Sequence, residues 1–434
     1  MGSHAFVSKG DVMKRLLFYI VCVLCVAHAQ AQVASTTALL GAWSGKLKFG
    51  IQSLTLVLHM EQKDGYVVIA LDSPDQGAKG IGAFKEFLSD DSIAVRFDAL
   101  NASYRAHLHN GRLEGKFTQN GIPFRLSLER GVPEVKRPQR PQPPYPYKAE
   151  EVSFINEADG ATLAGTLTYP VGYDATSSEK PAVVLFVSGS GQQNRDEEIF
   201  SHAPFHVLAD YLARRGIASL RYDDRATGSS VGGEVESATT EDFMRDAAAG
   251  ISFLREQKAF GRVGCLGHSE GGSIAFMLGA QGLVDFIVSL AAPGVKGDTL
   301  LAAQNNCILS LSGQVADMTV EKVHQLDAVK EIPWMKWFVT YDPSAHLQAT
   351  RCPVFALNGE RDVQVIASLN LPAIRRLLPT APRHLFKSYP ALNHLFQHCT
   401  TGLPTEYGQI EETISPEVLR DIADWIGSLE SVAL

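Results

Sequence analysis

A proline-rich segment divides the chain into two parts with different hydrophobic patterns. Six prolines fall between residues 131 and 150, and such a stretch favours the extended polyproline conformation of a semi-rigid spacer. Before it, apolar residues recur with the period of two that marks half-buried strands. After it, short apolar strands alternate with helices. We therefore predict a small β domain at 33–130, a proline-rich linker at 131–150 and a larger α/β domain at 151–434.

Two asparagine–glycine pairs fix the strand pairing that we predict in the first domain. Asn110-Gly111 and Asn120-Gly121 suit two-residue hairpin turns, in which both central residues take positive φ. Closing the two turns places the same apolar residues on one face of the sheet. We therefore expect a small all-β antiparallel barrel or sandwich. The expected pairs are Leu108 with Leu113, Ala106 with Gly115, Tyr104 with Phe117, Phe117 with Phe124, Gly115 with Leu126 and Leu113 with Leu128.

The first thirty residues have the order of parts of a secretory signal peptide. Met13-Lys14-Arg15 supplies a positive start, residues 16–26 are apolar, and Ala29-Gln30-Ala31 offers a small-x-small cleavage site. The apolar run is too short for a membrane span, which needs about 20 residues. We expect a signal peptide at 1–31, with 1–12 as an upstream extension, and hence a secreted or periplasmic protein.

Charge and cysteine content exclude some partners and leave other questions open. The formal net charge is −8 and no basic block occurs, which argues against nucleic-acid binding. Beyond the predicted signal lie Cys265, Cys307, Cys352 and Cys399, with no Cys-x-x-Cys among them, so we predict no metal site and no cofactor. In an oxidising compartment the four allow three disulfide pairings, although Cys265, inside an apolar strand, is expected to be a buried free thiol. The oligomeric state stays open.

The second domain reads as a doubly wound, mostly parallel sheet. Continuous apolar runs indicate buried parallel strands, and Phe243, Ala247, Ile251 and Leu254 form the apolar stripe of a helix between two of them. Strands that alternate with helices place helices on both faces of the sheet. The strands expected are 182–187, 218–222, 262–266, 285–290, 354–357 and 384–388, after a strand pair at 152–154 and 163–169.

A serine lies between glycines where one of these strands turns into a helix. In Gly267-His268-Ser269-Glu270-Gly271, flanking glycines would let Ser269 occupy a strained turn that exposes its hydroxyl group. A serine hydroxyl needs a base to take its proton and an acid to orient that base. His394 and Asp362 come later in the chain in the required order, each just after a predicted strand. Glu360, which is nearer its strand, is the rival acid.

Other residues are candidates for the oxyanion hole and for substrate binding. A tetrahedral intermediate needs two backbone N–H donors, which we expect from Glu270, the residue after the serine, and from Ser190 in the loop after strand 182–187. Gly191 and Gln192 of that loop are candidate substrate contacts. A short cap insertion at 295–350 adds aromatic candidates for an apolar acyl pocket, whose alternative role is packing within the cap. These are Trp334, Trp337 and Phe338.

Five segments of the second domain, in this order, resemble the secreted bacterial α/β-hydrolase family of serine esterases, which is related to serine aminopeptidase-like hydrolases. The segments are SGSGQQNRD (188–196), RYDDRATGSS (221–230), GHSEGG (267–272), LNGERDVQV (357–365) and LNHLFQ (392–397). The resemblance implies an α/β-hydrolase fold and hydrolysis of a small-molecule carboxylic ester, with Ser269, Asp362 and His394 as triad. We expect short acyl groups, with an acylated carbohydrate as one candidate substrate. The alternatives are a serine peptidase of the aminopeptidase-like branch and a non-catalytic glycan-binding protein.

Overall fold

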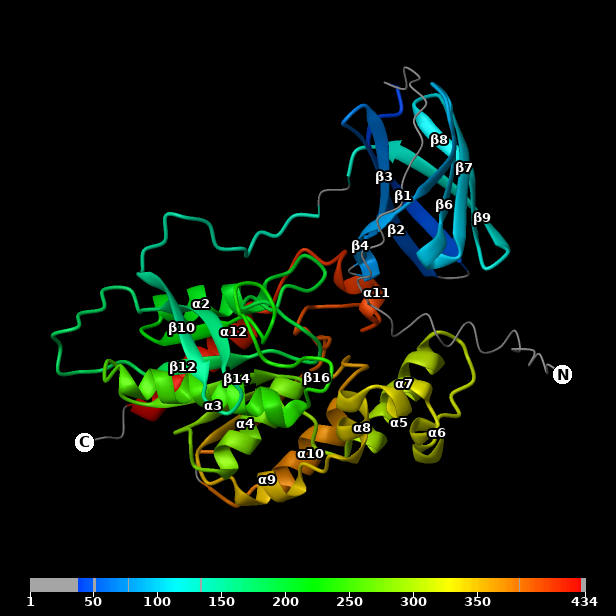
Figure 1. The fold of residues 1–434 in the computed structure, drawn as a ribbon. Coiled ribbons are helices and arrows are strands. Elements are labelled where there is room, and N and C mark those ends of the chain that lie inside the picture. Colours follow the sequence, from blue (N-terminus) through cyan, green and yellow to red (C-terminus); the bar gives the residue numbers. More distant parts are fainter. Residues whose placement is uncertain (1–37, 50–51, 77, 133–134, 382, 431–434) are drawn as a thin grey trace. The chain divides into compact units, whose positions relative to one another are not determined.

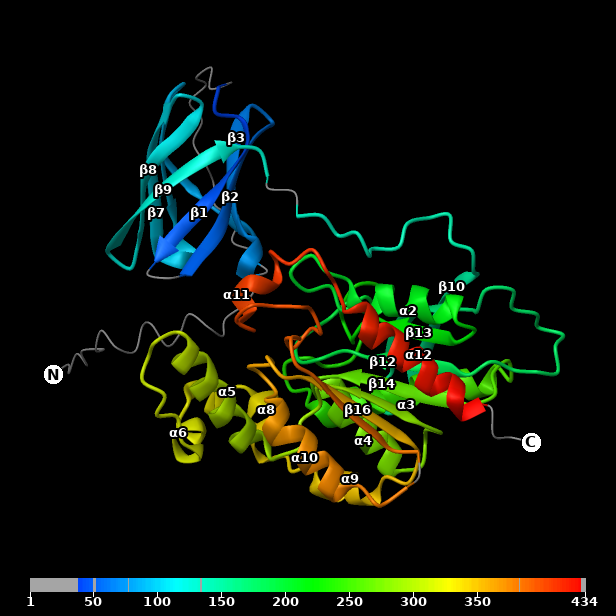
Figure 2. The ribbon, with the colours of Figure 1, turned by 180° about the vertical axis from the view of Figure 1, so that it is seen from behind.

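The computed structural model describes residues 38–49, 52–76, 78–132, 135–381 and 383–430. The chain forms two compact units, one ending at Glu134 and one beginning at Val135 (Figures 1 and 2). The predicted signal peptide and its upstream extension lie outside the described residues. Among the helices of the described part, none is both long enough and apolar enough to cross a membrane.

The first unit is a single antiparallel sheet of nine strands that curls into a barrel-like shape (Figure 1). Its spatial order is β4-β3-β2-β1-β9-β8-β7-β6-β5, so the two outer strands are consecutive in the sequence. The strands are β1 (Gly41–Phe49), β2 (Gln52–Lys63), β3 (Tyr66–Ser73), β4 (Ala78–Gly82), β5 (Phe84–Leu88), β6 (Ser92–Phe97), β7 (Ala102–His109), β8 (Arg112–Gln119) and β9 (Ile122–Arg130), with short 3₁₀ turns at Pro74–Gln76 and Asp98–Leu100.

The two asparagine–glycine turns set the register of this sheet. All four turn residues have positive φ, and every pair predicted from them is present between β7 and β8 and between β8 and β9. The apolar members face inward, where Tyr104, Leu113 and Leu128 are buried. Gly115 has no room for a side chain, because a Cβ there would lie 2.1 Å from the carbonyl oxygen of Arg105. The predicted hairpins are confirmed.

The second unit is built on an eight-stranded sheet in the order β10-β11-β13-β12-β14-β15-β16-β17. The strands β10 and β11 pair antiparallel, and β11 is antiparallel to β13; the remaining pairs are parallel. This confirms the mostly parallel sheet expected from the sequence. The strands are β10 (Ala149–Asn156), β11 (Ala161–Thr168), β12 (Val183–Val187), β13 (Ala218–Tyr222), β14 (Val263–His268), β15 (Ile287–Leu290), β16 (Val354–Gly359) and β17 (Leu385–Tyr389).

Helices cover both faces of this sheet (Figures 1 and 2). Helices α2 (Pro204–Arg214) and α12 (Pro416–Glu430) pack together and contribute to one apolar core. Helices α3 (Thr240–Glu256), α4 (Glu270–Ala280), α9 (Ser344–Ala349) and α10 (Ala367–Leu377) contribute to the core on the other face. The predicted apolar stripe lies on α3, where Ala247, Ile251 and Leu254 are buried. A doubly wound sheet of this kind binds ligands at the carboxyl ends of its strands.

A cap of short helices is inserted between β15 and β16. Besides α9, it comprises α5 (Gly297–Leu311), α6 (Val320–His324), α7 (Asp327–Glu331) and α8 (Pro333–Thr340). A further short helix, α11 (Pro404–Tyr407), precedes α12.

Two residues of the proline-rich segment, within the second unit, form hydrogen bonds with the segment that follows α11. The guanidinium group of Arg137 donates to the carbonyl oxygens of Gly408 and Ile410, each at 2.8 Å. The side chain of Gln139 donates to the carbonyl oxygen of Ile414 at 2.7 Å and accepts from the N–H of Thr413 at 2.6 Å. The described part of the segment has one internal backbone hydrogen bond, from the N–H of Arg140 to the carbonyl oxygen of Arg137 at 3.0 Å, so these side-chain bonds do most to hold it in place.

Candidate active site

Ser269 occupies a strained turn between β14 and α4. Its backbone angles are φ +54° and ψ −117°, and its N–H donates to the carbonyl oxygen of Leu290 at 2.8 Å. The turn has no space for side chains at two of its glycines. A Cβ at Gly267 would lie 1.9 Å from the carbonyl oxygen of Gly271, and a Cβ at Gly271 would lie 2.1 Å from that of Val187. Strain of this kind at a non-glycine residue points to a functional position.

Asp362 and His394 form a buried pair at the carboxyl end of the sheet. Oδ2 of Asp362 lies 2.7 Å from Nδ1 of His394. Oδ1 of Asp362 accepts the backbone N–H groups of Gln364 and Val365 at 2.8 and 2.9 Å. The rival acid Glu360 is exposed and accepts instead from the hydroxyl group of Ser388, at 2.7 Å. Of the two acids, Asp362 is the one that bonds the histidine.

The turn that carries Ser269 contacts the loop that carries His394. The ring centroids of His268 and His394 are 4.7 Å apart, and Nε2 of His268 lies 3.0 Å from the carbonyl oxygen of His394. Both segments come after parallel strands of one sheet, so they meet at the same edge. A strained serine whose turn contacts the loop of a histidine bonded to a buried carboxylate has the parts of a nucleophilic triad.

The loop after β12 runs beside Ser269. A Cβ at Gly189 would lie 3.3 Å from Cβ of Ser269, so the loop backbone approaches the serine closely. The N–H of Gly189 donates to Oε1 of Glu197 at 2.7 Å, which leaves the N–H of Ser190 as the candidate donor from this loop. Glu270 is the first residue of α4, and the N–H groups of a first helical turn have no partner within the helix.

Gly191 and Gln192 differ in their surroundings. Gly191 has a φ of +94° and lines a small pocket beside the serine turn. The amide group of Gln192 donates to the hydroxyl group of Thr227 at 3.2 Å. The structure therefore places Gly191 in the pocket and ties the side chain of Gln192 to the loop after β13.

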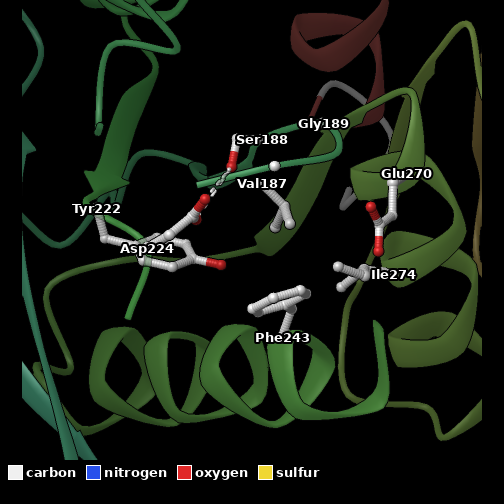
Figure 3. A pocket seen from close by; sticks show the side chains of 9 residues that line it. Val187, Ser188, Gly189, Tyr222, Asp224, Phe243, Glu270 and Ile274 are labelled. Atoms are coloured by element: carbon white, nitrogen blue, oxygen red, sulfur yellow. Dashed lines mark hydrogen bonds between the residues drawn. The ribbon is translucent and has the colours of Figure 1, made fainter. Parts of the chain in front are cut away.

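The pocket has two carboxyl groups among apolar walls, of which that of Glu270 is buried. Figure 3 shows Glu270 and Asp224 on opposite sides of it, with Val187 and Phe243 between them. The cavity measures about 10 Å³, which is room for about one water-sized group. The residues that line it are Val187, Ser188, Gly189, Gly191, Tyr222, Asp224, Phe243, Glu270 and Ile274.

The carboxyl group of Glu270 accepts hydrogen bonds from α3 and from the cap. Its Oε1 accepts the hydroxyl group of Thr240 at 2.6 Å and the indole N–H of Trp334 at 2.7 Å. Its Oε2 is buried and, among the described residues, has no hydrogen-bond partner. Burial raises the pKa of Glu270, while hydrogen bonds from Thr240, Trp334 and Ser190 lower it in part.

Asp224 faces the same pocket from the loop after β13. It accepts the hydroxyl group of Ser188 at 3.1 Å and the N–H of Gln193 at 2.8 Å. Burial raises the pKa of Asp224 to about 8, with a smaller contribution from the charge of Glu270. Asp224 and Glu197 are not among the predicted site residues, because their segments resemble the family without any local pattern that would assign them a role.

The aromatic residues of the cap have two different surroundings. Trp334 donates to Glu270 and stacks on Phe338 with ring centroids 5.1 Å apart. Phe338 is buried in the core of the unit. Trp337 stacks on Tyr341 at 4.8 Å and packs, partly buried, against the same core. Of the three predicted cap residues, Trp334 is thus the one that bonds a residue of the pocket, and the other two pack within the cap.

The four cysteines in the described part are all free. Cys265 is buried on β14, as predicted, and burial raises the pKa of its thiol group. Within the described ranges, no group of three or more histidine, cysteine, aspartate or glutamate side chains is arranged to hold a metal ion.

Comparisons with known proteins agree with this architecture. Residues 182–351 match the family model described as "Serine aminopeptidase, S33". Esterase EstD of Thermotoga maritima is 30% identical over 217 residues, which cover 47% of this chain and 50% of EstD. The chain therefore matches about half the length of that relative.

Solved structures of esterases are also similar in fold. Esterase Pf2001 of Pyrococcus furiosus is 16% identical, with 69% of this chain and 98% of that chain covered and a TM-score of 0.45. Est1E from Butyrivibrio proteoclasticus is 14% identical, with 65% and 99% covered and a TM-score of 0.43. The second unit of the protein has the α/β-hydrolase fold. Within that unit, residues 182–351 are similar to the serine aminopeptidase family, and part of the chain is similar to the esterase EstD.

Proposed function

We propose that the protein is a serine hydrolase that cleaves carboxylic esters through Ser269, His394 and Asp362. The observation that carries the proposal is the 2.7 Å hydrogen bond between Asp362 and His394, beside the strained turn of Ser269. Asp362 fixes the imidazole with Nδ1 protonated, so that Nε2 can take the proton of the serine hydroxyl group. The similarity to an esterase, EstD, supports an ester as substrate.

The reaction proceeds through an acyl-enzyme. The Ser269 oxygen attacks the ester carbonyl carbon, and the N–H groups of Glu270 and Ser190 stabilise the resulting oxyanion. His394 then gives its proton to the departing alcohol. Water, activated by the same histidine, releases the acid and restores the serine.

We assign short acyl groups, including those of acylated carbohydrates, to this site. The pocket beside the serine turn has room for about one water-sized group, and Trp334 of the cap donates to Glu270, which lines it. The expected order of kcat/KM is acetyl above butyryl above octanoyl for 4-nitrophenyl esters. A preference for octanoyl would rule out this assignment.

Labelling with a fluorophosphonate tests the class of function, since such a probe reacts only with an activated serine. The native protein is expected to be labelled and Ser269→Ala to remain unlabelled, with the same melting temperature. An unlabelled native protein would favour the non-catalytic, glycan-binding alternative.

A buried carboxyl oxygen favours one second candidate, the hydrolysis of aminoacyl substrates. Oε2 of Glu270 is buried next to Ser269 without a partner among the described residues, and a carboxylate in that position could receive a substrate's ammonium group. Alanine methyl ester and methyl propionate differ by that amine. Preference for the alanine ester, lost in Glu270→Gln, would favour this candidate, and preference for the propionate would reject it.

We also propose that the protein is exported to the periplasm or the medium, on the strength of the signal-like order of residues 1–31. Amino-terminal sequencing of the protein recovered from a bacterial periplasm or culture medium tests this. A mature chain that starts shortly after Ala29 or Ala31 is expected, and a full-length chain retained in the cytoplasm would contradict it.

A further inference from the structure

A second histidine–carboxylate pair lies beside the first. Nδ1 of His268 is 2.9 Å from Oε1 of Glu197, and Nε2 of His268 is 3.0 Å from the carbonyl oxygen of His394. His268 is 6% exposed and Glu197 is 3% exposed. The proposed reaction uses neither side chain, yet His268 is the residue immediately before Ser269.

The contacts of His268 favour a charged imidazolium. Both ring nitrogens face oxygen atoms, of a carboxyl group and of a carbonyl, and an N–H group on each nitrogen satisfies both. Neutral imidazole has one N–H, whereas imidazolium has two. The pKa of His268 agrees in direction: burial lowers it, but attraction to Glu197 and the hydrogen bonds to Glu197 and to the carbonyl of His394 outweigh burial, so it is raised.

The pair joins three segments of the site. Besides His268, Oε1 of Glu197 accepts the N–H of Gly189 at 2.7 Å, and Gly189 is the loop residue whose backbone approaches Ser269. His268 belongs to the turn of the serine and bonds the backbone of His394. One carboxylate and one imidazolium therefore connect the loop after β12, the serine turn and the loop of the histidine base.

We propose that Glu197 and His268 are positioning residues that hold the backbone of His394 and the 188–191 loop in register with Ser269. The role rests on the proposed serine hydrolase function. Glu197 fixes the peptide before the Ser190 donor, and His268 fixes the peptide of His394, whose ring must meet the serine hydroxyl group. Neither residue touches the substrate, so they act on the rate of the chemical step and not on binding.

Two neutral substitutions test the proposal, Glu197→Gln and His268→Gln. Each is expected to lower kcat on 4-nitrophenyl acetate at least tenfold while KM changes less than threefold, because small misplacements of reacting groups can cost about 100-fold in rate. The double variant is expected to lose no more than the more damaging single variant, since the two residues act as one unit.

His384→Gln is the matched control. His384 also has both ring nitrogens bonded, Nδ1 to the N–H of Val354 at 3.1 Å and Nε2 to the carbonyl oxygen of Pro379 at 2.9 Å. It lies at the amino ends of β16 and β17, whereas the site lies at the carboxyl ends. Its replacement is expected to leave kcat within twofold of the native value, even where the melting temperature changes.

The pH profile separates positioning from simple stabilisation of the fold. The ionisable groups that face His268 are Glu197, His394 and Asp362. Because Glu197 stabilises the imidazolium and raises the pKa of His268, activity is expected to persist in the native enzyme until His268 loses its proton. In Glu197→Gln burial dominates, so the alkaline limb of kcat/KM is expected to move to lower pH.

Nuclear magnetic resonance of ¹⁵N-histidine-labelled protein measures the pair without turnover. At pH 7 we expect two protonated nitrogens on His268, identified by the signal lost in His268→Gln, and one in Glu197→Gln. A native His268 with one protonated nitrogen, or either variant with native kcat and pH profile, would overturn the positioning role. A native protein that hydrolyses no ester and resists the fluorophosphonate would overturn the proposed function itself.

Discussion

Replacing Asp362 by asparagine tests the central pair of the site with little change of shape. Oδ1 of Asp362 accepts two backbone N–H groups, from Gln364 and Val365, and Oδ2 accepts from His394. Asparagine has one oxygen, which must stay with the two N–H donors. Its NH₂ group then faces Nδ1 of His394, so Nδ1 must accept a hydrogen bond and the proton of the ring moves to Nε2. With Nε2 protonated, the ring can no longer take a proton from Ser269.

The expected loss of kcat is large, whereas the expected loss of stability is small. Where this tautomer is reversed in a serine triad, kcat falls about 10⁴-fold, which corresponds to about 5.5 kcal/mol of transition-state stabilisation. The same change removes one charge-assisted hydrogen bond, which contributes about 1.5–3 kcal/mol to stability. We therefore expect Asp362→Asn to fold, to melt at a somewhat lower temperature and to be nearly inactive.

The assay is kcat/KM on the ester that the native enzyme hydrolyses fastest, with thermal unfolding followed by circular dichroism. Glu360→Gln is the control, because Glu360 is exposed and accepts from Ser388 rather than from the histidine; it is expected to keep activity within twofold. A folded Asp362→Asn enzyme with more than a tenth of native activity, or an equal loss in Glu360→Gln, would refute the argument.

Three further changes test the pocket and the first unit. Trp334→Phe removes one of the donors to the buried carboxyl group of Glu270, and we expect a loss of about 1–3 kcal/mol in the free energy of unfolding by urea; an unchanged value would contradict that bond. Burial raises the pKa of Asp224 to about 8. Between about pH 4 and pH 8 the folded state therefore keeps a proton that the unfolded state has lost, and the stability of the native protein falls as pH rises. Asp224→Asn should therefore gain more in melting temperature over the native protein at pH 7.5 than at pH 4, and equal gains would contradict the shift. Gly115→Ala would place a Cβ 2.1 Å from the carbonyl oxygen of Arg105, so we expect the first unit to unfold at lower temperature in calorimetry; an unchanged first transition would show that the strands can move apart.

The sequence was most informative where structure depends on neighbouring residues. The hairpins of the first unit result from two asparagine–glycine turns, because positive φ at both residues leaves one register for the flanking strands. The turn at Ser269 depends in the same way on Gly267 and Gly271, which have no room for side chains. Asp362 and His394 could be named because the loops after the strands of a parallel sheet all lie at one edge of it.

Aromatic residues of the cap show where such reasoning ends. On α8, Trp334 stacks on Phe338 and Trp337 stacks on Tyr341, two pairs at the spacing of one helical turn. Helical periodicity alone does not indicate which of the two pairs faces the pocket. The contact of Trp334 with Glu270 depends on how the cap closes over α4, and those two residues are 64 positions apart.

The pair of His268 and Glu197 could not be predicted from the sequence either, because it too depends on tertiary structure. Glu197 and His268 are separated by 71 residues, and Glu197 lies on an irregular loop with a φ of +51°, where no periodicity indicates the direction of a side chain. A buried carboxylate requires a partner, and so does a buried imidazolium, but this requirement becomes visible only when burial is known. Both groups are buried where three loops meet, and this burial is the reason to expect a charge on His268 that experiment can detect.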